Sequence, residues 1–141
     1  AKDLFHGNGS IEGRLAYTLA EFKFVREPAF LGNYIPGQPK HLLRAEIRYD
    51  HPNGFWLAPG IDWSPASYFV NSANTVTNPA YAVFNVRAGF DRKWFGIFVD
   101  ASNLFDRNYS GSVQVDDAAG RYFEPSNGRS ATVGFVYRFG R

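Results

Sequence analysis

The side chains best suited to metal or acid–base chemistry are scattered along this chain. The histidines share no spacing typical of metal ligands: His6, His41 and His51. Asp116, Asp117 and Glu124 fall in one long polar segment, where carboxylates can hold a cation, but their spacing lacks a calcium-loop pattern. Cysteine is absent, which excludes a thiolate metal site, a disulfide and a cysteine nucleophile. We therefore expect neither a metal site nor a cofactor.

Enzymatic motifs are also missing. No serine–histidine–aspartate arrangement and no glycine-rich phosphate loop can be read, and no carboxylates are paired at useful positions. The net charge of +2 arises from 15 basic and 13 acidic residues, and the basic residues form no run. We predict that the chain is not an enzyme and does not bind nucleic acid.

The charged residues do follow a pattern, because they alternate with apolar ones. In residues 41–50, Arg44, Glu46 and Arg48 alternate with Leu43, Ala45, Ile47 and Tyr49. The same alternation places Arg87, Asp100 and Arg138 on the polar sides of three later segments. A period of two predicts β-strands with one dry and one wet face.

The elements that carry these residues form an all-β fold, an antiparallel up-and-down meander of about six strands. The predicted strands span about 13–26, 41–50, 54–67, 81–91, 94–105 and 129–139. Segments 51–54 and 91–93 read as tight turns, whereas the other connections are long. Strands of about ten residues with short turns at one end and long loops at the other are typical of an outer-membrane β-barrel.

Alternation alone leaves two readings of this meander open. In a soluble sandwich the apolar face packs inward, and in a membrane barrel it faces lipid while the charged face lines a wet lumen. Small residues mixed with aromatic ones on the apolar faces favour lipid, as do aromatic residues gathered near the short turns. These residues are Tyr49, Phe55, Trp56, Phe90, Trp94, Phe95, Tyr137 and Phe139.

Three collinear segments carry a resemblance to a known family. "NLFDRNY" (103–109) closes the fifth predicted strand, "GNYIPGQPKHLLRAEIRYDHPNGFWLAPGIDW" spans 32–63, and "AGRYFEPSNGRSATVGFVYRF" spans 119–139. Together they resemble the C-terminal part of the barrel of TonB-dependent outer-membrane receptors, over roughly residues 15–139.

The resemblance implies a location in the outer membrane of a Gram-negative bacterium and a role in uptake of a metal chelate such as a ferric siderophore. The implied partners are outer-membrane lipid, the rest of the barrel and its plug, the barrel-assembly machinery, and TonB through an N-terminal part not present here. Since closed single-chain barrels start at about eight strands, we assign residues 15–141 to a C-terminal barrel segment. Residues 1–14 are a leader or an engineered junction, because "IEGR" (11–14) matches the recognition sequence of a tag-removing protease.

The resemblance also suggests roles for particular residues. Lumen-facing or plug-facing candidates, which are otherwise a solvated charged face, are Arg44, Glu46, Arg48, Arg87, Asp100 and Arg138. Ligand candidates in the long loops, otherwise loop packing, are Tyr34, Tyr68, Phe69, Tyr109, Arg121, Tyr122 and Phe123. Tyr137 and Phe139 resemble the assembly signal that ends such barrels. The alternatives are a small soluble β-sandwich that binds carbohydrate or a partner, and an engineered or self-assembling barrel fragment.

Overall fold

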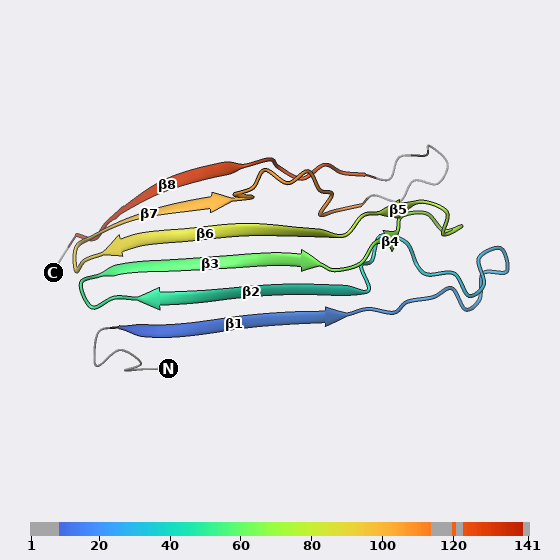
Figure 1. The fold of residues 1–141 in the computed structure, drawn as a ribbon, viewed down its shortest axis with the longest axis horizontal. Coiled ribbons are helices and arrows are strands. Elements are labelled where there is room, and N and C mark those ends of the chain that lie inside the picture. The colour runs from blue at the N-terminus through green and yellow to red at the C-terminus, as the bar shows by residue number, and fades with distance from the viewer. Residues whose placement is uncertain (1–8, 114–119, 121–122, 140–141) are drawn as a thin grey trace.

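The computed structural model describes residues 9–113, 120 and 123–139, and they form one six-stranded antiparallel sheet with a two-stranded hairpin beyond its end (Figure 1). The sheet order is β1-β2-β3-β6-β7-β8, so each strand pairs with the next sheet strand along the chain. The strands are β1 (Ser10–Leu19), β2 (His41–Asp50), β3 (Phe55–Ser64), β6 (Tyr81–Asp91), β7 (Phe95–Ser102) and β8 (Ser130–Tyr137). The hairpin pairs β4 (Tyr68–Phe69) with β5 (Thr77–Asn78). The all-β meander is therefore confirmed.

Several strand ends differ from the sequence-based ranges. β1 begins at Ser10, so part of the segment assigned to a leader pairs with β2, and it ends at Leu19, where the chain leaves the ladder. β3 ends at Ser64 because the next residue, Pro65, has no amide hydrogen to donate. Pro59 lies within β3 opposite Val86, and the pairing with β2 is interrupted beside it. β4 and β5 were not predicted, since strands of two residues are too short to show periodicity.

The connections divide between the two ends of the sheet. The β2–β3 and β6–β7 turns are short and lie at one end, and both are closed by backbone hydrogen bonds, from His51 N to Phe55 O and from Arg92 N to Phe95 O (2.8 Å each). Three long connections lie at the opposite end, over residues 20–40, over 65–80, and over the described parts of 103–129, which are 103–113, 120 and 123–129 (Figure 1). This is the asymmetry that the sequence predicts.

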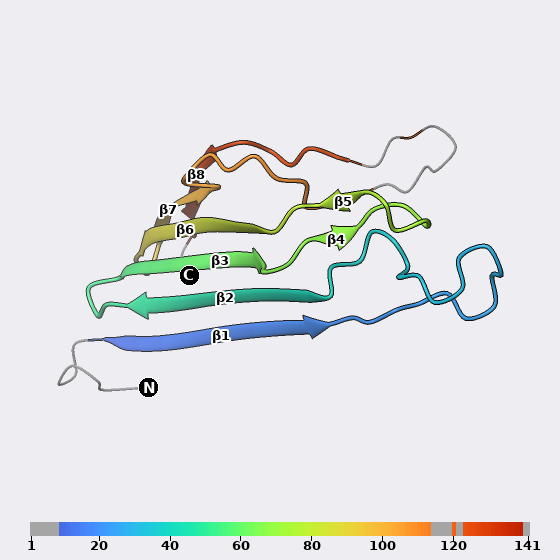
Figure 2. The same ribbon diagram turned by 45° about the vertical axis from the view of Figure 1, so that its right-hand side comes forward.

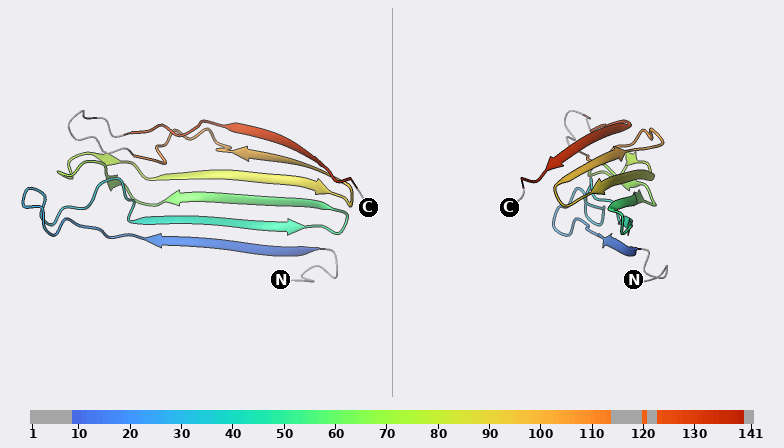
Figure 3. Two further views of the ribbon diagram at one scale, coloured as in Figure 1. Left: turned by 180° about the vertical axis from the view of Figure 1, so that it is seen from behind. Right: turned by 90° about the vertical axis from the view of Figure 1, so that its left-hand side faces the viewer.

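The strand register separates two faces, which we call the apolar face and the polar face. Ala45, for example, lies opposite Leu15 and Ile61, whereas Glu46 lies opposite Arg14 and Gly60. The apolar face carries no formally charged side chain on any of the six sheet strands. In the end-on view the strands follow one another along a curve, and the turned view shows β7 and β8 swinging out of the plane of β1–β3 (Figures 2 and 3).

No second sheet covers the apolar face within the described part of the chain. Leu15 is 72% exposed, Val133 68% and Phe135 65%. The buried side chains instead gather where the long loops leave the sheet, and they include Val70 and Asn78. A sandwich would bury its apolar face against a second layer, so this arrangement contradicts the sandwich alternative. No helix among the described residues is long and apolar enough to cross a membrane.

Candidate functional site

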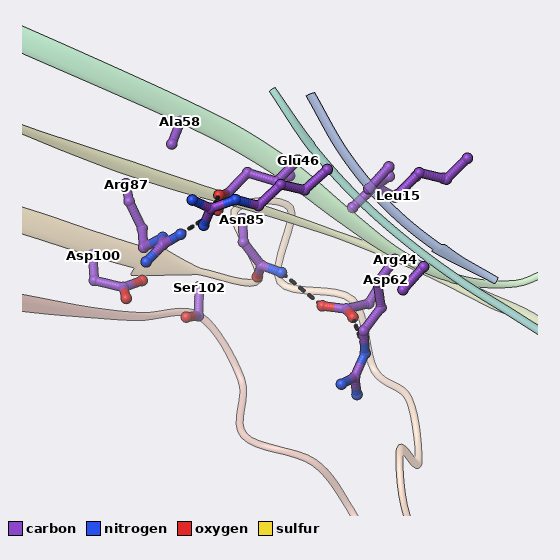
Figure 4. Close-up of a pocket in the computed structure, with 14 residues that line it drawn as sticks. Leu15, Arg44, Glu46, Ala58, Asp62, Asn85, Arg87, Asp100 and Ser102 are labelled. Atoms are coloured by element: carbon purple, nitrogen blue, oxygen red, sulfur yellow. Dashed lines mark hydrogen bonds and ion pairs between the residues drawn. The ribbon is translucent and has the colours of Figure 1, made fainter. Parts of the chain in front are cut away.

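The polar face holds a hollow of about 510 Å³ to which five strands contribute (Figure 4). Its polar side chains come from β1, β2, β3, β6 and β7: Arg14, Arg44, Glu46, Asp62, Asn85, Arg87, Asp100 and Ser102. Four of the six predicted lumen-facing residues therefore line one surface. Four polar residues of the hollow were not predicted to face the lumen, although they lie in strands that the sequence predicts: Arg14, Asp62, Asn85 and Ser102.

An ion pair between Glu46 and Arg87 crosses the middle of this hollow (Figure 4). The two residues lie on β2 and β6, which do not pair with each other, because β3 runs between them. On the polar face β3 presents only Ala58 and Gly60 at this point, so the Arg87 side chain has room to pass over it. A Cβ at Gly60 would lie 3.1 Å from the Ala45 carbonyl oxygen. The small residues of β3 thus make the long-range pair possible.

A second polar chain runs nearer the long loops. Arg44 Nε lies 2.8 Å from Asp62 Oδ1, and Asn85 donates to Asp62 Oδ2 at 3.0 Å (Figure 4). Arg14 extends the first pair, with Nη1 at 3.7 Å from Glu46 Oε1. Because these groups are partly exposed, each pair contributes about 0–1 kcal/mol to stability, so their main effect is to fix side-chain orientation.

Asp100 differs from the other carboxylates of the hollow. The register places it directly opposite Arg87, but Arg87 is engaged by Glu46. Among the described residues, no cation lies within ion-pair distance of Asp100. The hollow therefore presents a carboxylate beside Ser102 that is open to a further group.

Aromatic rings and glycines alternate along one row of the polar face nearer the short turns. The register aligns Trp56, Gly89, Phe98 and Gly134 on four successive strands of the sheet. A Cβ at Gly89 would lie 2.6 Å from the Trp56 ring, and one at Gly134 would lie 2.2 Å from the Phe98 ring. Each ring therefore lies flat over the glycine of the next strand. Trp56 lies near the short turns, as the sequence predicts, and the register places it on the polar face.

The remaining two lumen candidates lie toward the short turns. Arg48 binds Asp50 at 2.7 Å, and its guanidinium lies 4.3 Å from the centre of the Trp56 ring. Arg138 binds Asp91 at 3.0 Å and donates to the Arg92 carbonyl oxygen, also at 3.0 Å. Arg138 thus fastens the end of β8 to the β6–β7 turn and does not line the hollow.

The assembly-signal candidates lie at the same end. The Tyr137 and Phe139 rings meet edge to face with centres 4.8 Å apart, and Trp94 lies against the Tyr137 ring at 6.3 Å. Phe139 is 91% exposed. This aromatic cluster is available to a partner.

At the other end, asparagine side chains fasten two of the long loops together. Asn74 accepts from the Tyr34 amide at 2.7 Å and donates to the Tyr34 carbonyl oxygen at 2.9 Å, so its amide group pairs as a backbone unit does. Asn33 donates to the Ser72 carbonyl oxygen at 2.9 Å, and Gly37 N donates to the Phe69 carbonyl oxygen at 2.8 Å. The loop over 20–40 and the loop over 65–80 are therefore preorganised.

A hollow of about 240 Å³ lies between these two loops, and we call it the loop hollow. Three ligand candidates line it, Tyr34, Tyr68 and Phe69, and the Tyr34 and Phe69 rings stack with centres 6.1 Å apart. Residues that were not predicted complete the wall: Phe22, Ile35, Gln38, Lys40 and His41. They were missed because no sequence period links these positions, and only the fold brings them together.

Lys40 is the formally charged side chain that lines the loop hollow. Glu21 binds both Lys40 (3.4 Å) and Lys23 (3.7 Å). Lys40 lowers the pKa of the Glu21 carboxyl, and a hydrogen bond from Tyr34 adds to this lowering. Burial raises the pKa of the Tyr68 hydroxyl, although a hydrogen bond from Asn78 opposes the rise.

The other ligand candidates lie elsewhere. Tyr109 packs on Tyr81 with ring centres 5.0 Å apart, away from the loop hollow. Phe123 is 50% exposed, and Arg121 and Tyr122 lie outside the described residues.

No group of histidine and carboxylate side chains suited to a metal occurs among the described residues. His41 shares a 2.7 Å hydrogen bond with the Tyr17 hydroxyl, and His51 accepts from the Asn53 amide. Glu124 lies in an isolated bridge with Ser112, while His6, Asp116 and Asp117 are outside the described part of the chain.

The chain also matches the model of a known protein family. The family model described as TonB dependent receptor-like, beta-barrel matches residues 7–104 of the 141-residue chain. The matched range contains β1 to β7, both short turns and the two fastened loops.

Proposed function

We propose that this chain, which belongs to the TonB-dependent receptor family, supplies the C-terminal six strands of an outer-membrane barrel that takes up a metal chelate such as a ferric siderophore. The supporting observation is the division of one uncovered sheet into an apolar face and a charged face. An apolar face without a partner layer suits lipid, and a charged face suits a wet lumen.

In this proposal the polar face contacts the plug that the family carries inside its barrel. The prearranged pairs Glu46–Arg87 and Arg44–Asp62 present fixed hydrogen-bonding groups, and Asp100 offers a free carboxylate to a plug cation or amide. Tyr137 and Phe139 act as the signal read by the assembly machinery. Among the described residues, β1 and β8 are the two end strands of the sheet, and in this proposal they adjoin the rest of the barrel.

The loop hollow is the proposed contact for the chelate. Stacked rings beside Lys40 suit an aromatic anionic ligand. The predicted ligand residues Tyr34, Tyr68 and Phe69 already lie together there, which lowers the cost of ordering them on binding.

Fractionation tests the membrane part of the proposal. We expect the chain in the outer-membrane fraction, extracted only by detergent. A species much heavier than 15.8 kDa would identify it as part of a complete receptor, whereas a detergent-dependent 15.8 kDa species would indicate an assembling fragment. A chain that stays in solution without detergent would contradict the proposal.

Titration with a ferric tris-catecholate complex, followed by tryptophan fluorescence, tests the ligand. Phe69→Ala should weaken binding about three- to tenfold, since one aromatic contact contributes about 0.5–1.5 kcal/mol beyond its buried area. Val25→Ala is the matched control, because Val25 is exposed in the same loop system but does not line the hollow. Equal binding by the two variants would refute this site.

A further inference from the structure

The turn that follows β7 has a built geometry that the uptake role does not use. Asn103, which is 2% exposed and has a positive φ of 52°, accepts from the Arg107 amide at 2.8 Å and donates to the Arg107 carbonyl oxygen at 2.9 Å. Asp106, with φ of 51°, accepts from the Arg129 amide at 2.9 Å. The side chains of Asn103 and Asp106 therefore fix the conformation of the "NLFDR" segment (103–107) between β7 and β8.

This turn places an aromatic ring and a cation at the loop-end rim of the apolar face. Phe105 is 75% exposed and meets the Phe84 ring edge to face, with centres 5.4 Å apart. Arg107 lines a depression of about 330 Å³ with Trp63, Ala80, Tyr81 and Ala82. Trp63, Ala82 and Phe84 all belong to the apolar face.

Arg107 stands out because of its charge. The apolar face has no formally charged side chain along the sheet strands, and Arg107 lies at its border. The Arg107 guanidinium has no carboxylate within ion-pair distance among the described residues, and only its backbone groups hold the turn. Its side chain is thus free for an anion from outside the chain.

Trp63 also borders a second depression on its other side. This one measures about 310 Å³ and is lined by Tyr17, His41, Leu43, Trp63 and Pro65. It lies on the apolar face, and its Tyr17–His41 hydrogen bond points polar groups toward the loop end. A molecule that occupied both depressions would contact apolar side chains of the strands and, toward the long loops, the polar groups of Tyr17, His41 and Arg107.

We propose that Arg107, Trp63 and Phe105 form a site for a phosphate-bearing lipid of the outer leaflet, with the phosphate on Arg107 and an acyl chain against Trp63 and Phe84. The inference rests on the proposed membrane location. Arg suits phosphate because its planar donors match the phosphate oxygens. A lipid fits better than free phosphate because the single cation is flanked by two depressions lined largely by apolar and aromatic side chains.

The test uses the full chain, reconstituted in phosphatidylcholine vesicles doped with bisphosphorylated lipid A and then extracted in mild detergent. Mass spectrometry measures the lipid A retained per chain. Arg107→Gln should retain about tenfold less, in line with the loss of one hydrogen bond to a charged group. Arg107→Lys should retain an intermediate amount, and an excess of inorganic phosphate should not displace the lipid.

Arg26→Gln serves as the control, because Arg26 is exposed in a long loop and also lacks an ion pair with any described carboxylate. Equal loss in both variants would mean diffuse charge attraction and overturn the site. Displacement by inorganic phosphate would assign Arg107 to a soluble anion instead.

Protease protection of the reconstituted chain separates this inference from the function it depends on. A chain that is protected but whose lipid retention ignores Arg107 refutes only the lipid site. A chain that is not protected refutes the membrane location as well.

Discussion

A single methyl group at Gly89 tests how the row of rings and glycines holds the sheet. The Cβ of Gly89→Ala would lie 2.6 Å from two atoms of the Trp56 ring and 2.7 Å from Nε1. A ring is rigid, so the indole must tilt away and lose its contact with Arg48. Overpacking typically costs about 1–3 kcal/mol, and a cation–π contact contributes about 0.5–2 kcal/mol. We expect the free energy of unfolding to fall by about 2–4 kcal/mol.

The assay is denaturant unfolding of the chain in detergent, followed by far-UV circular dichroism so that loss of a tryptophan does not remove the signal. Gly13→Ala is the control, because nothing lies within 4 Å of a Cβ built there. It should change the free energy of unfolding by less than about 0.5 kcal/mol.

A double-mutant cycle then isolates the contact. With Trp56→Ala already present, Gly89→Ala should cost little, since alanine tolerates a strand better than glycine once the ring is gone. A similar cost in both backgrounds would show that the ring does not lie on Gly89, and the reasoning would be refuted.

Three further outcomes follow from the polar face and the loops. Arg87→Ala should lower the free energy of unfolding by about 1–2 kcal/mol, because Glu46 is only 20% exposed and loses its nearest cation. Adding Glu46→Gln to Arg87→Ala should recover most of the lost stability. No recovery in the double variant would contradict the pairing of Glu46 with Arg87. Asn74→Gly tolerates the positive φ of 56° but removes the hydrogen bonds to Tyr34. Hydrogen exchange of the Tyr34 amide should therefore accelerate, while exchange of the Val133 amide in β8 stays unchanged. An unchanged rate at Tyr34 would show that the Asn74 side chain does not hold the two loops together. The pKa of Glu21 is lower in the folded than in the unfolded chain, so its pairing with Lys40 is complete above the unfolded-state pKa and is lost as the pH falls through the folded-state pKa. The chemical shifts of the Glu21 and Lys40 amides should follow this acid transition in the parent. They should not follow it in Glu21→Gln.

The sheet could be predicted from the sequence because each strand repeats one simple rule. Residues such as Arg44 and Glu46 alternate with Leu43 and Ala45, and alternation determines both the strand and the face. The nearness of Trp56 to a turn could be predicted, but its face could not, because the face follows from the register through β3. The space that Gly89 leaves for the Trp56 ring can be recognised only once the register of β3 and β6 is known.

The loops could be predicted only as loops. The hydrogen bonds between Asn74 and Tyr34 join positions 40 residues apart, and no local sequence pattern predicts such a contact. The loop hollow depends on that pairing, so Phe22 and Lys40 could not be assigned to it from the sequence. Asp100 was predicted to face the lumen. That it has no ion-pair partner among the described residues could not be predicted, because Arg87 lies opposite Asp100 in the register but pairs with Glu46.

The pair between Glu46 and Arg87 has a mechanical consequence. Backbone ladders join only adjacent strands, so a sheet sheared along its strands can slip at one ladder at a time. A pair that spans β3 acts as a diagonal brace, since a slip at either ladder of β3 that moves β2 relative to β6 would separate Glu46 from Arg87. A sheet braced in this way resists shear between β2 and β6, two strands that no single backbone ladder joins.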